Sequence, residues 1–295
     1  MGHPGGRLDW VGVIDTVLTL PDGRSLAYTD CGEPAGPLVV YFHGAPSSRL
    51  DLVGAEESFS AFGVRVVSPD RPGYGGSSPQ AGRGFSDWAP DVAALADHLG
   101  AERFAVMGSS SGGPYAVACA ALLPERIVGA GVVAGVTDMG WPGAWDGYEQ
   151  SEATLMRIGD EAAALRWCQE RYGPDGSRFF DSVGEMAAAD LALLGDEAVA
   201  NGFFTTVSEA FHQGVGGFAQ DITVQGRPWP FDPSLITART RVLHGQADTF
   251  VPIAHGRHTA DVIPGASLTV FPDHGHLSII TEIPQLTADL TGSLR

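Results

Sequence analysis

The chain has no lysine: its 17 basic residues are all arginines, set against 35 aspartates and glutamates. The formal net charge of -18 excludes proteins that bind nucleic acid through a basic surface, because such binding depends on cationic side chains that meet phosphates. An anionic membrane surface would repel so acidic a chain as well. We therefore expect neither nucleic acid nor a membrane as a partner.

Cysteines and long apolar runs are also scarce. Cys31, Cys119 and Cys168 are odd in number and widely spaced, which predicts neither a disulfide framework nor a zinc site. No apolar stretch approaches the roughly 20 residues that a transmembrane helix needs. No basic start followed by an apolar run marks a secretory signal at the N-terminus. These absences predict a cytoplasmic protein with reduced thiols.

What is present is a globular composition, with 44% hydrophobic and 18% charged residues. Eight apolar runs bounded by Gly, Pro or Asp are predicted as strands: residues 11–20, 25–30, 38–42, 64–68, 104–107, 128–136, 242–244 and 268–271. The short central runs are apolar on both faces, as in buried parallel strands. Helical patterns at 86–99 and 112–123 lie between them. This alternation predicts an α/β fold with a mostly parallel, eight-stranded, doubly wound sheet.

One long stretch breaks the alternation. Residues 137–234 hold no convincing strand, only helical patterns such as 151–172 and 196–213. We predict a helical cap here, inserted into a core formed by residues 1–136 and 235–295. Between Asp138 and Asp232 there are sixteen acidic residues and five arginines. This excess indicates an acidic solvated surface, and the alternative is a surface that discourages anionic substrates.

The pattern Gly108-Ser109-Ser110-Ser111-Gly112 follows one predicted strand directly and precedes a helix. A serine in such a tight strand–turn–helix has a strained backbone, and its neighbours two positions away must be small. Only Ser110 has glycine at both of those positions. A serine hydroxyl is a weak nucleophile and needs a base to take its proton. We predict Ser110 as the nucleophile.

The base is expected on the loop after the last strand, where two histidines compete. We choose His276 over His274, because Gly275 lets the loop come close and a closing helix starts just after. An acid must then hold the imidazole in one tautomer. Asp248, four residues past a strand, is the first choice, with Asp138 as its rival. The chain order Ser110, Asp248, His276 is the expected order of nucleophile, acid and base.

Acyl transfer also needs donors for the developing oxyanion. The amide of Ser111 is one candidate, and the amide of Ala45, in the loop after the third strand, is the other. Gly44 in that loop allows a close backbone approach. His43 is expected to brace the loop, with direct contact to the substrate as the minor alternative.

These motifs resemble the α/β-hydrolase superfamily over nearly the whole chain. Pro69-Asp70-Arg71-Pro72-Gly73-Tyr74-Gly75-Gly76-Ser77 is similar to the turn after the fourth strand in capped members. Gln220-Asp221 and Arg227-Pro228-Trp229 resemble a subset of bacterial hydrolases. The family includes esterases, lactonases and proline iminopeptidases, although the peptidases carry a different loop at positions 43–47. Epoxide hydrolases and haloalkane dehalogenases use aspartate where this chain has Ser110, which disfavours both.

The resemblance implies a serine hydrolase that needs no metal and no organic cofactor. We expect a small, largely apolar ester, thioester or lactone as the substrate. A carbon–carbon hydrolase or biosynthetic cyclase with the same triad is the alternative, and a ligand receptor without catalysis is a further one. Trp141, Trp145 and Tyr148, at the start of the predicted cap, are candidates for lining the acyl pocket, while packing between cap and core is the role expected for most of them.

Overall fold

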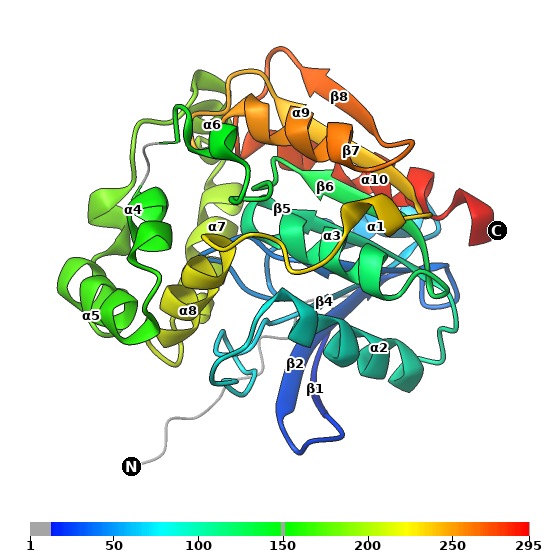
Figure 1. Cartoon of the computed structure of the whole chain (residues 1–295). Helices are drawn as coiled ribbons and strands as arrows, with labels where there is room; N and C mark the ends of the chain where they lie inside the picture. The colour runs from blue at the N-terminus through cyan, green and yellow to red at the C-terminus, as the bar shows by residue number, and fades with distance from the viewer. Residues whose placement is uncertain (1–12, 149–150, 295) are drawn as a thin grey trace.

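A computed structural model gives the structure of residues 13–148 and 151–294. Eight strands form one sheet in the order β1-β2-β4-β3-β5-β6-β7-β8 (Figure 1). The pairs β1/β2 and β2/β4 are antiparallel and the other five are parallel, which confirms the predicted sheet. The bounds are β1 Ile14–Thr19, β2 Ser25–Gly32, β3 Leu38–Phe42, β4 Arg65–Pro69, β5 Phe104–Ser109, β6 Ile127–Val133, β7 Arg239–Gly245 and β8 Ser267–Phe271. Residues 1–12, which include the start of the first predicted strand, lie outside the described residues.

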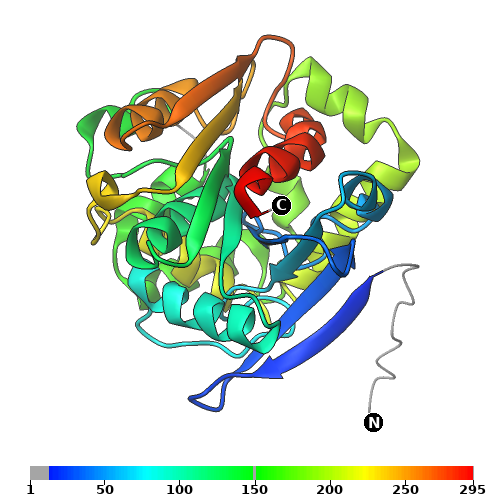
Figure 2. The same cartoon turned by 90° about the vertical axis from the view of Figure 1, so that its right-hand side faces the viewer.

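Helices cover both faces of the sheet, as Figures 1 and 2 show. One hydrophobic cluster joins the sheet to α2 (Trp88–His98), α3 (Gly113–Leu122) and the end of α9 (Ile253–Val262). A second cluster joins the other face to α1 (Glu56–Ala61) and α10 (Ile283–Leu290). Every side chain of β3, β5 and β6 is buried, because these central strands are covered on both sides. None of the helices in the described part of the chain is long and apolar enough to cross a membrane.

Between β6 and β7, the described residues form helices and loops but no strand. We call residues 134–238 the inserted segment. Its helices pack around a hydrophobic cluster of their own, which also takes in Tyr74 and Val251 from the sheet region. The ends of the predicted cap, residues 137 and 234, fall inside this segment. Its α-helices are α4 (Ser151–Ile158), α5 (Glu161–Tyr172), α6 (Ala188–Leu194), α7 (Glu197–Ala210) and α8 (Gly216–Gln225).

The single helix predicted over residues 151–172 is wrong, because the chain forms two helices there. Gly159 adopts a left-handed conformation with φ of +69°, which ends α4. Asp160 then caps α5, and its side chain accepts a hydrogen bond from the amide of Ala163 at 2.8 Å. Gly159 thus ends one helix and Asp160 caps the start of the next, and the spacing of the apolar residues alone did not indicate this break.

A buried ionic cluster joins the inserted segment to the sheet. The carboxylate of Asp221 on α8 is fully buried, 2.8 Å from Nη2 of Arg71 and 3.0 Å from Nη2 of Arg83. The hydroxyls of Tyr115 and Tyr74 donate to the same carboxylate at 2.6 and 3.1 Å. Burial by itself would raise the pKa of Asp221, but the two guanidinium groups hold it well below its usual range. The carboxylate is therefore charged and paired, as a buried charge must be.

We expect Asp221→Ala to lower the free energy of unfolding by about 3–5 kcal/mol, because Arg71 and Arg83 would lose their shared carboxylate inside the protein. Denaturant titration measures this loss. Asp97→Ala is the control: it removes an ion pair to Arg126 in which the aspartate is 67% exposed. That pair should contribute no more than about 1 kcal/mol. Equal losses in the two variants would contradict a special role for the buried cluster.

Candidate active site

Ser110 lies at a sharp turn between β5 and the short 3₁₀ helix η2 (Ser110–Gly112), which leads into α3. Its φ of +51° is a left-handed conformation that non-glycine residues rarely adopt, so the turn is strained. A Cβ atom on Gly108 would collide with the carbonyl oxygen of Gly112. A Cβ atom on Gly112 would collide with the carbonyl oxygen of Phe42 on β3. The two glycines are therefore what permits the turn that exposes Ser110.

A chain of hydrogen bonds links Ser110, His276 and Asp248. Oγ of Ser110 lies 3.0 Å from Nε2 of His276, and Nδ1 of His276 lies 2.8 Å from Oδ2 of Asp248. Each of the three residues follows the carboxyl end of a strand: β5, β8 and β7. Since these strands are parallel, the three loops meet at one edge of the sheet. The structure thus brings the three predicted residues into contact.

The carboxylate of Asp248 is fixed by more than His276. Its Oδ1 accepts hydrogen bonds from the amides of Phe250 and Val251, both at 2.9 Å. Nε2 of the buried His244 lies 3.3 Å from its Oδ2 and donates to the carbonyl of Val251. Burial would raise the pKa of Asp248, but His276 and His244 keep it well below its usual range. Burial likewise would lower the pKa of His276, and Asp248 overcomes this, so that the pKa lies above its ordinary value.

The two rival residues lie elsewhere. Oδ1 of Asp138 accepts hydrogen bonds from the amides of Gly140 and Trp229, both at 2.9 Å, and so shapes a loop of the inserted segment. The ring of His274 packs edge-on against Phe271, and its Nε2 lies 3.7 Å from a carboxylate oxygen of Glu282. The contacts of Ser110 and His276 therefore involve neither rival.

The loop after β3, which includes His43 and Gly44, lies against Ser110 and is held by hydrogen bonds from Arg71. The guanidinium group of Arg71 donates hydrogen bonds to the carbonyls of His43 and Gly44. Nδ1 of His43 donates to the carbonyl of Gly44 at 2.7 Å, and its Nε2 accepts from the amide of Arg71 at 3.1 Å. Burial and the charge of Arg71 hold the pKa of His43 well below its ordinary value, so the ring is neutral, as these two bonds require. Contrary to the minor alternative, His43 braces this loop and does not line the cavity.

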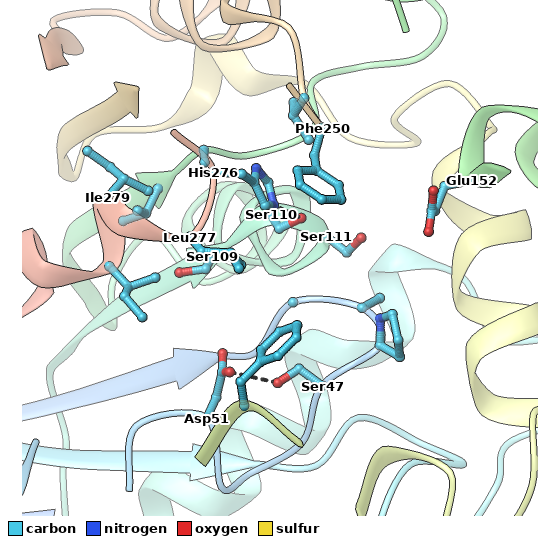
Figure 3. Close-up of a pocket in the computed structure, with 18 of the residues that line it drawn as sticks. Ser47, Asp51, Ser109, Ser110, Ser111, Glu152, Phe250, His276, Leu277 and Ile279 are labelled. Atoms are coloured by element: carbon cyan, nitrogen blue, oxygen red, sulfur yellow. Dashed lines mark hydrogen bonds between the residues drawn. The ribbon is translucent and has the colours of Figure 1, made fainter. Parts of the chain in front are cut away.

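A cavity of about 150 Å³ opens in front of Ser110 and His276 (Figure 3). Gly44, Ala45 and Ser111 line it, as does Tyr148 from the inserted segment. Steric space does not require glycine at position 44. A Cβ atom there would make an ordinary contact of 3.5 Å with Cβ of Ser110. The remaining lining is mostly apolar: Pro46, Val133, Ala134, Phe179, Val183, Met186, Phe203, Phe250, Val251, Leu277, Ile279 and Ile280, with Ser47, Asp51, Ser109 and Glu152 as further polar members.

Trp141 and Trp145 do not line this cavity, which corrects their candidacy for the acyl pocket and agrees with the packing role expected for most of these aromatic residues. The ring of Trp141 stacks on His258, with a centroid distance of 4.1 Å. The indole N–H of Trp145 donates to the carbonyl of Met139, and Arg157 lies over its ring at 4.4 Å. Both side chains therefore serve packing, because their faces are already occupied.

Asp190, a fully buried residue on α6, belongs to the site although no sequence motif pointed to it. Its carboxylate accepts hydrogen bonds from the amides of His276, Leu277 and Ser278 at 2.8–3.1 Å, and from the hydroxyl of Ser278 at 2.8 Å. A Cβ atom on Gly275 would collide with this carboxylate. Gly275 is thus small because Asp190 lies against it, and the inserted segment itself holds the loop of His276.

Glu152 on α4 is a further residue of the cavity that no sequence motif indicated. Its half-buried side chain lines the cavity across from Ser110, on the other side of Phe250 in Figure 3. Burial raises the pKa of Glu152 above its ordinary value. In the described parts of the chain, no group of three or more His, Cys, Asp or Glu side chains is arranged to hold a metal ion.

The chain is similar to known proteins in sequence and in fold. A curated non-heme chloroperoxidase of Streptomyces lividans is 36% identical over 92% of this chain and 98% of its own. A bifunctional esterase/perhydrolase of Acinetobacter calcoaceticus is 25% identical over 94% of this chain and 99% of its own. The solved structure of an esterase from Exiguobacterium antarcticum matches with a TM-score of 0.70 at 20% identity, over 95% of this chain and 99% of that one. A family model described as alpha/beta hydrolase fold matches residues 37–283. The chain belongs to the alpha/beta hydrolase family.

Proposed function

We propose that the protein is a serine hydrolase that cleaves a largely apolar carboxylic ester, thioester or lactone. The observation that carries this proposal is the chain of contacts from Oγ of Ser110 through His276 to Asp248, at the mouth of a mostly apolar cavity. Relatives named as an esterase/perhydrolase and an esterase support acyl transfer from an ester. The mostly apolar lining of the cavity and the net charge of -18 favour an uncharged substrate over an anionic one.

In the first half-reaction, Ser110 gives its proton to Nε2 of His276 while Oγ bonds to the carbonyl carbon of the substrate. The carbonyl oxygen becomes an oxyanion and accepts hydrogen bonds from the amides of Ala45 and Ser111. Ser111 is in the first turn of η2, where amides have no partner within the helix. The intermediate then collapses, and the alcohol leaves with the proton that His276 returns.

In the second half-reaction, His276 takes a proton from water, and the hydroxide attacks the acyl group on Ser110. Collapse of this second intermediate releases the carboxylic acid and returns the proton to Ser110. Asp248 balances the charge of the imidazolium in both halves and keeps Nδ1 protonated, so that Nε2 faces Ser110.

We expect a fluorophosphonate probe to label the wild-type protein and not Ser110→Ala, because the probe needs an activated serine that displaces its fluoride. Hydrolysis of p-nitrophenyl esters by Ser110→Ala should fall on the order of 10⁶-fold in kcat. Ser109→Ala is the matched control. The hydroxyl of Ser109 is buried and takes no part in the proton transfer of this scheme, so labelling should persist in this variant. Equal labelling of wild type and Ser110→Ala would exclude the hydrolase and favour a ligand receptor.

Asp248→Asn should lower kcat by about 10⁴-fold, because an amide does not hold the tautomer of His276 that accepts the proton of Ser110. The loss of charge should also lower the pKa of His276, which Asp248 raises, so the acidic limb of the kcat/KM profile moves to lower pH. Stopped assays across pH measure both effects. Asp138→Asn should keep kcat within about threefold, since its contacts lie in another loop; the reverse outcome would make Asp138 the acid.

Asp190→Asn should lower kcat by about 10–100-fold with little change in KM, because an amide cannot accept all four hydrogen bonds that place His276. The charge of Asp190 also raises the pKa of His276, so its removal should shift the acidic limb of kcat to lower pH. A purely structural residue would lower stability without this shift. Asp196→Asn, which alters an exposed helix cap on the same segment, is the control and should leave both kcat and the pH profile intact.

A further inference from the structure

A second cavity, of about 500 Å³, adjoins the one that contains Ser110. Four residues line both cavities: Asp51, Phe203, Leu277 and Ile280. The second cavity lies between the loop before α1, the helices α6 and α7, and the start of α10. Figure 2 shows these elements gathered on one side of the molecule, with α1 in blue, α6 and α7 in yellow-green and α10 in red. We call this second cavity the side groove.

The side groove is apolar along most of its length. Leucines, valines, isoleucines and a proline from these elements line it, among them Leu52, Leu193, Leu194, Val199, Ile283 and Pro284. Asp51 is the sole charged residue among the described residues that line it. Its carboxylate already accepts hydrogen bonds from Tyr41 at 2.5 Å and from Ser47 at 2.7 Å. The groove therefore offers burial to an apolar group and no charged partner to a polar one.

The size of the two cavities indicates that they act together. Pockets for small ligands usually measure about 300–1,000 Å³. The cavity in front of Ser110, at about 150 Å³, is smaller than this range, and the side groove brings the combined space into it. Phe203 and Ile280 lie at the boundary between the two cavities, and both side chains are half-buried. Partly exposed side chains change rotamer within nanoseconds, so these two can move to let a chain pass.

We propose that the side groove binds an unbranched apolar chain of the substrate, which passes Phe203 and Ile280 while its carbonyl lies at Ser110. This inference rests on the proposed hydrolase function and makes the substrate longer than the small ester expected from the sequence. The chain belongs either to the acyl part or to the alcohol part of the ester, and the two are chemically alike inside the groove. Burial of each further methylene group then strengthens binding of the transition state.

Gly202 on α7 provides a direct test. It lines the side groove, its backbone is helical, and a Cβ atom there would meet no atom within 4 Å. Gly202→Leu therefore fills the groove without straining the fold and replaces a poor helix former by a good one. Gly216→Leu is the matched control, because Gly216 also has open space around its Cβ but does not line either cavity.

The measurement is the ratio of kcat/KM for a long chain over a short one, with p-nitrophenyl octanoate against acetate for the acyl side and octyl acetate against ethyl acetate for the alcohol side. Gly202→Leu should lower one of the two ratios at least about tenfold, the factor expected when roughly two methylene groups lose their burial. Gly216→Leu should leave both ratios within about twofold. Phe203→Ala should raise the ratio that Gly202→Leu lowers, because it removes part of the boundary.

The outcomes separate the two proposals. If the wild type hydrolyses the acetates through Ser110 and neither ratio responds to Gly202→Leu or Phe203→Ala, the side groove does not bind the chain and this inference is overturned, while the hydrolase function stands. If the wild type hydrolyses none of the esters and is not labelled at Ser110, the hydrolase function fails first. A lowered acyl ratio assigns the groove to the acid part, and a lowered alcohol ratio assigns it to the alcohol part.

Discussion

The buried pair of Arg71 and Asp221 is the interaction on which the arrangement of the site depends. The guanidinium group of Arg71 is planar, and its N–H donors have a fixed geometry. A side chain that binds one edge of this group therefore also orients the donors on its other edge. Asp221, 150 positions away on α8, fixes one edge at 2.8 Å. The other edge holds the carbonyls of His43 and Gly44, just before Ala45. A residue of the inserted segment thereby positions the loop that faces Ser110.

The inserted segment also reaches the opposite half of the site. Asp190 on α6 gathers three amides and a hydroxyl of the loop that carries His276. Hydrogen bonds to an ionised acceptor are stronger than neutral ones, and in a buried place their geometry is strictly held. Asp221 and Asp190, both in the inserted segment, contact residues on two sides of Ser110, so the segment is more than a cover over the cavity. Through these contacts, α6 positions the loop of His276, and α8 positions, by way of Arg71, the loop that faces Ser110.

The sequence predicted the sheet and the residues around Ser110 because both depend on short-range rules. Alternation of apolar runs with helical patterns predicted eight strands, and the spacing of Gly108 and Gly112 singled out one serine among three. The same kind of reasoning did not show which of Trp141, Trp145 and Tyr148 lines the cavity. Large aromatic residues near an insertion are candidates for a pocket, but partners such as His258 and Arg157 decide which way they face. His258 lies on α9 and Arg157 on α4, and periodicity does not reveal contacts with separate elements.

The sequence by itself determined the strained turn at Ser110, because backbone sterics act within a few residues. The order of the candidate nucleophile, acid and base along the chain is likewise a property of the sequence. Only the tertiary structure showed that Asp248, and not Asp138, contacts His276, brought Asp190 under the loop of His276, and placed the side groove beside the cavity of Ser110. These features depend on burial and on contacts between residues far apart in the chain. Which carboxylate meets which histidine follows from how parallel strands and inserted helices pack, and that packing is a property of the whole fold.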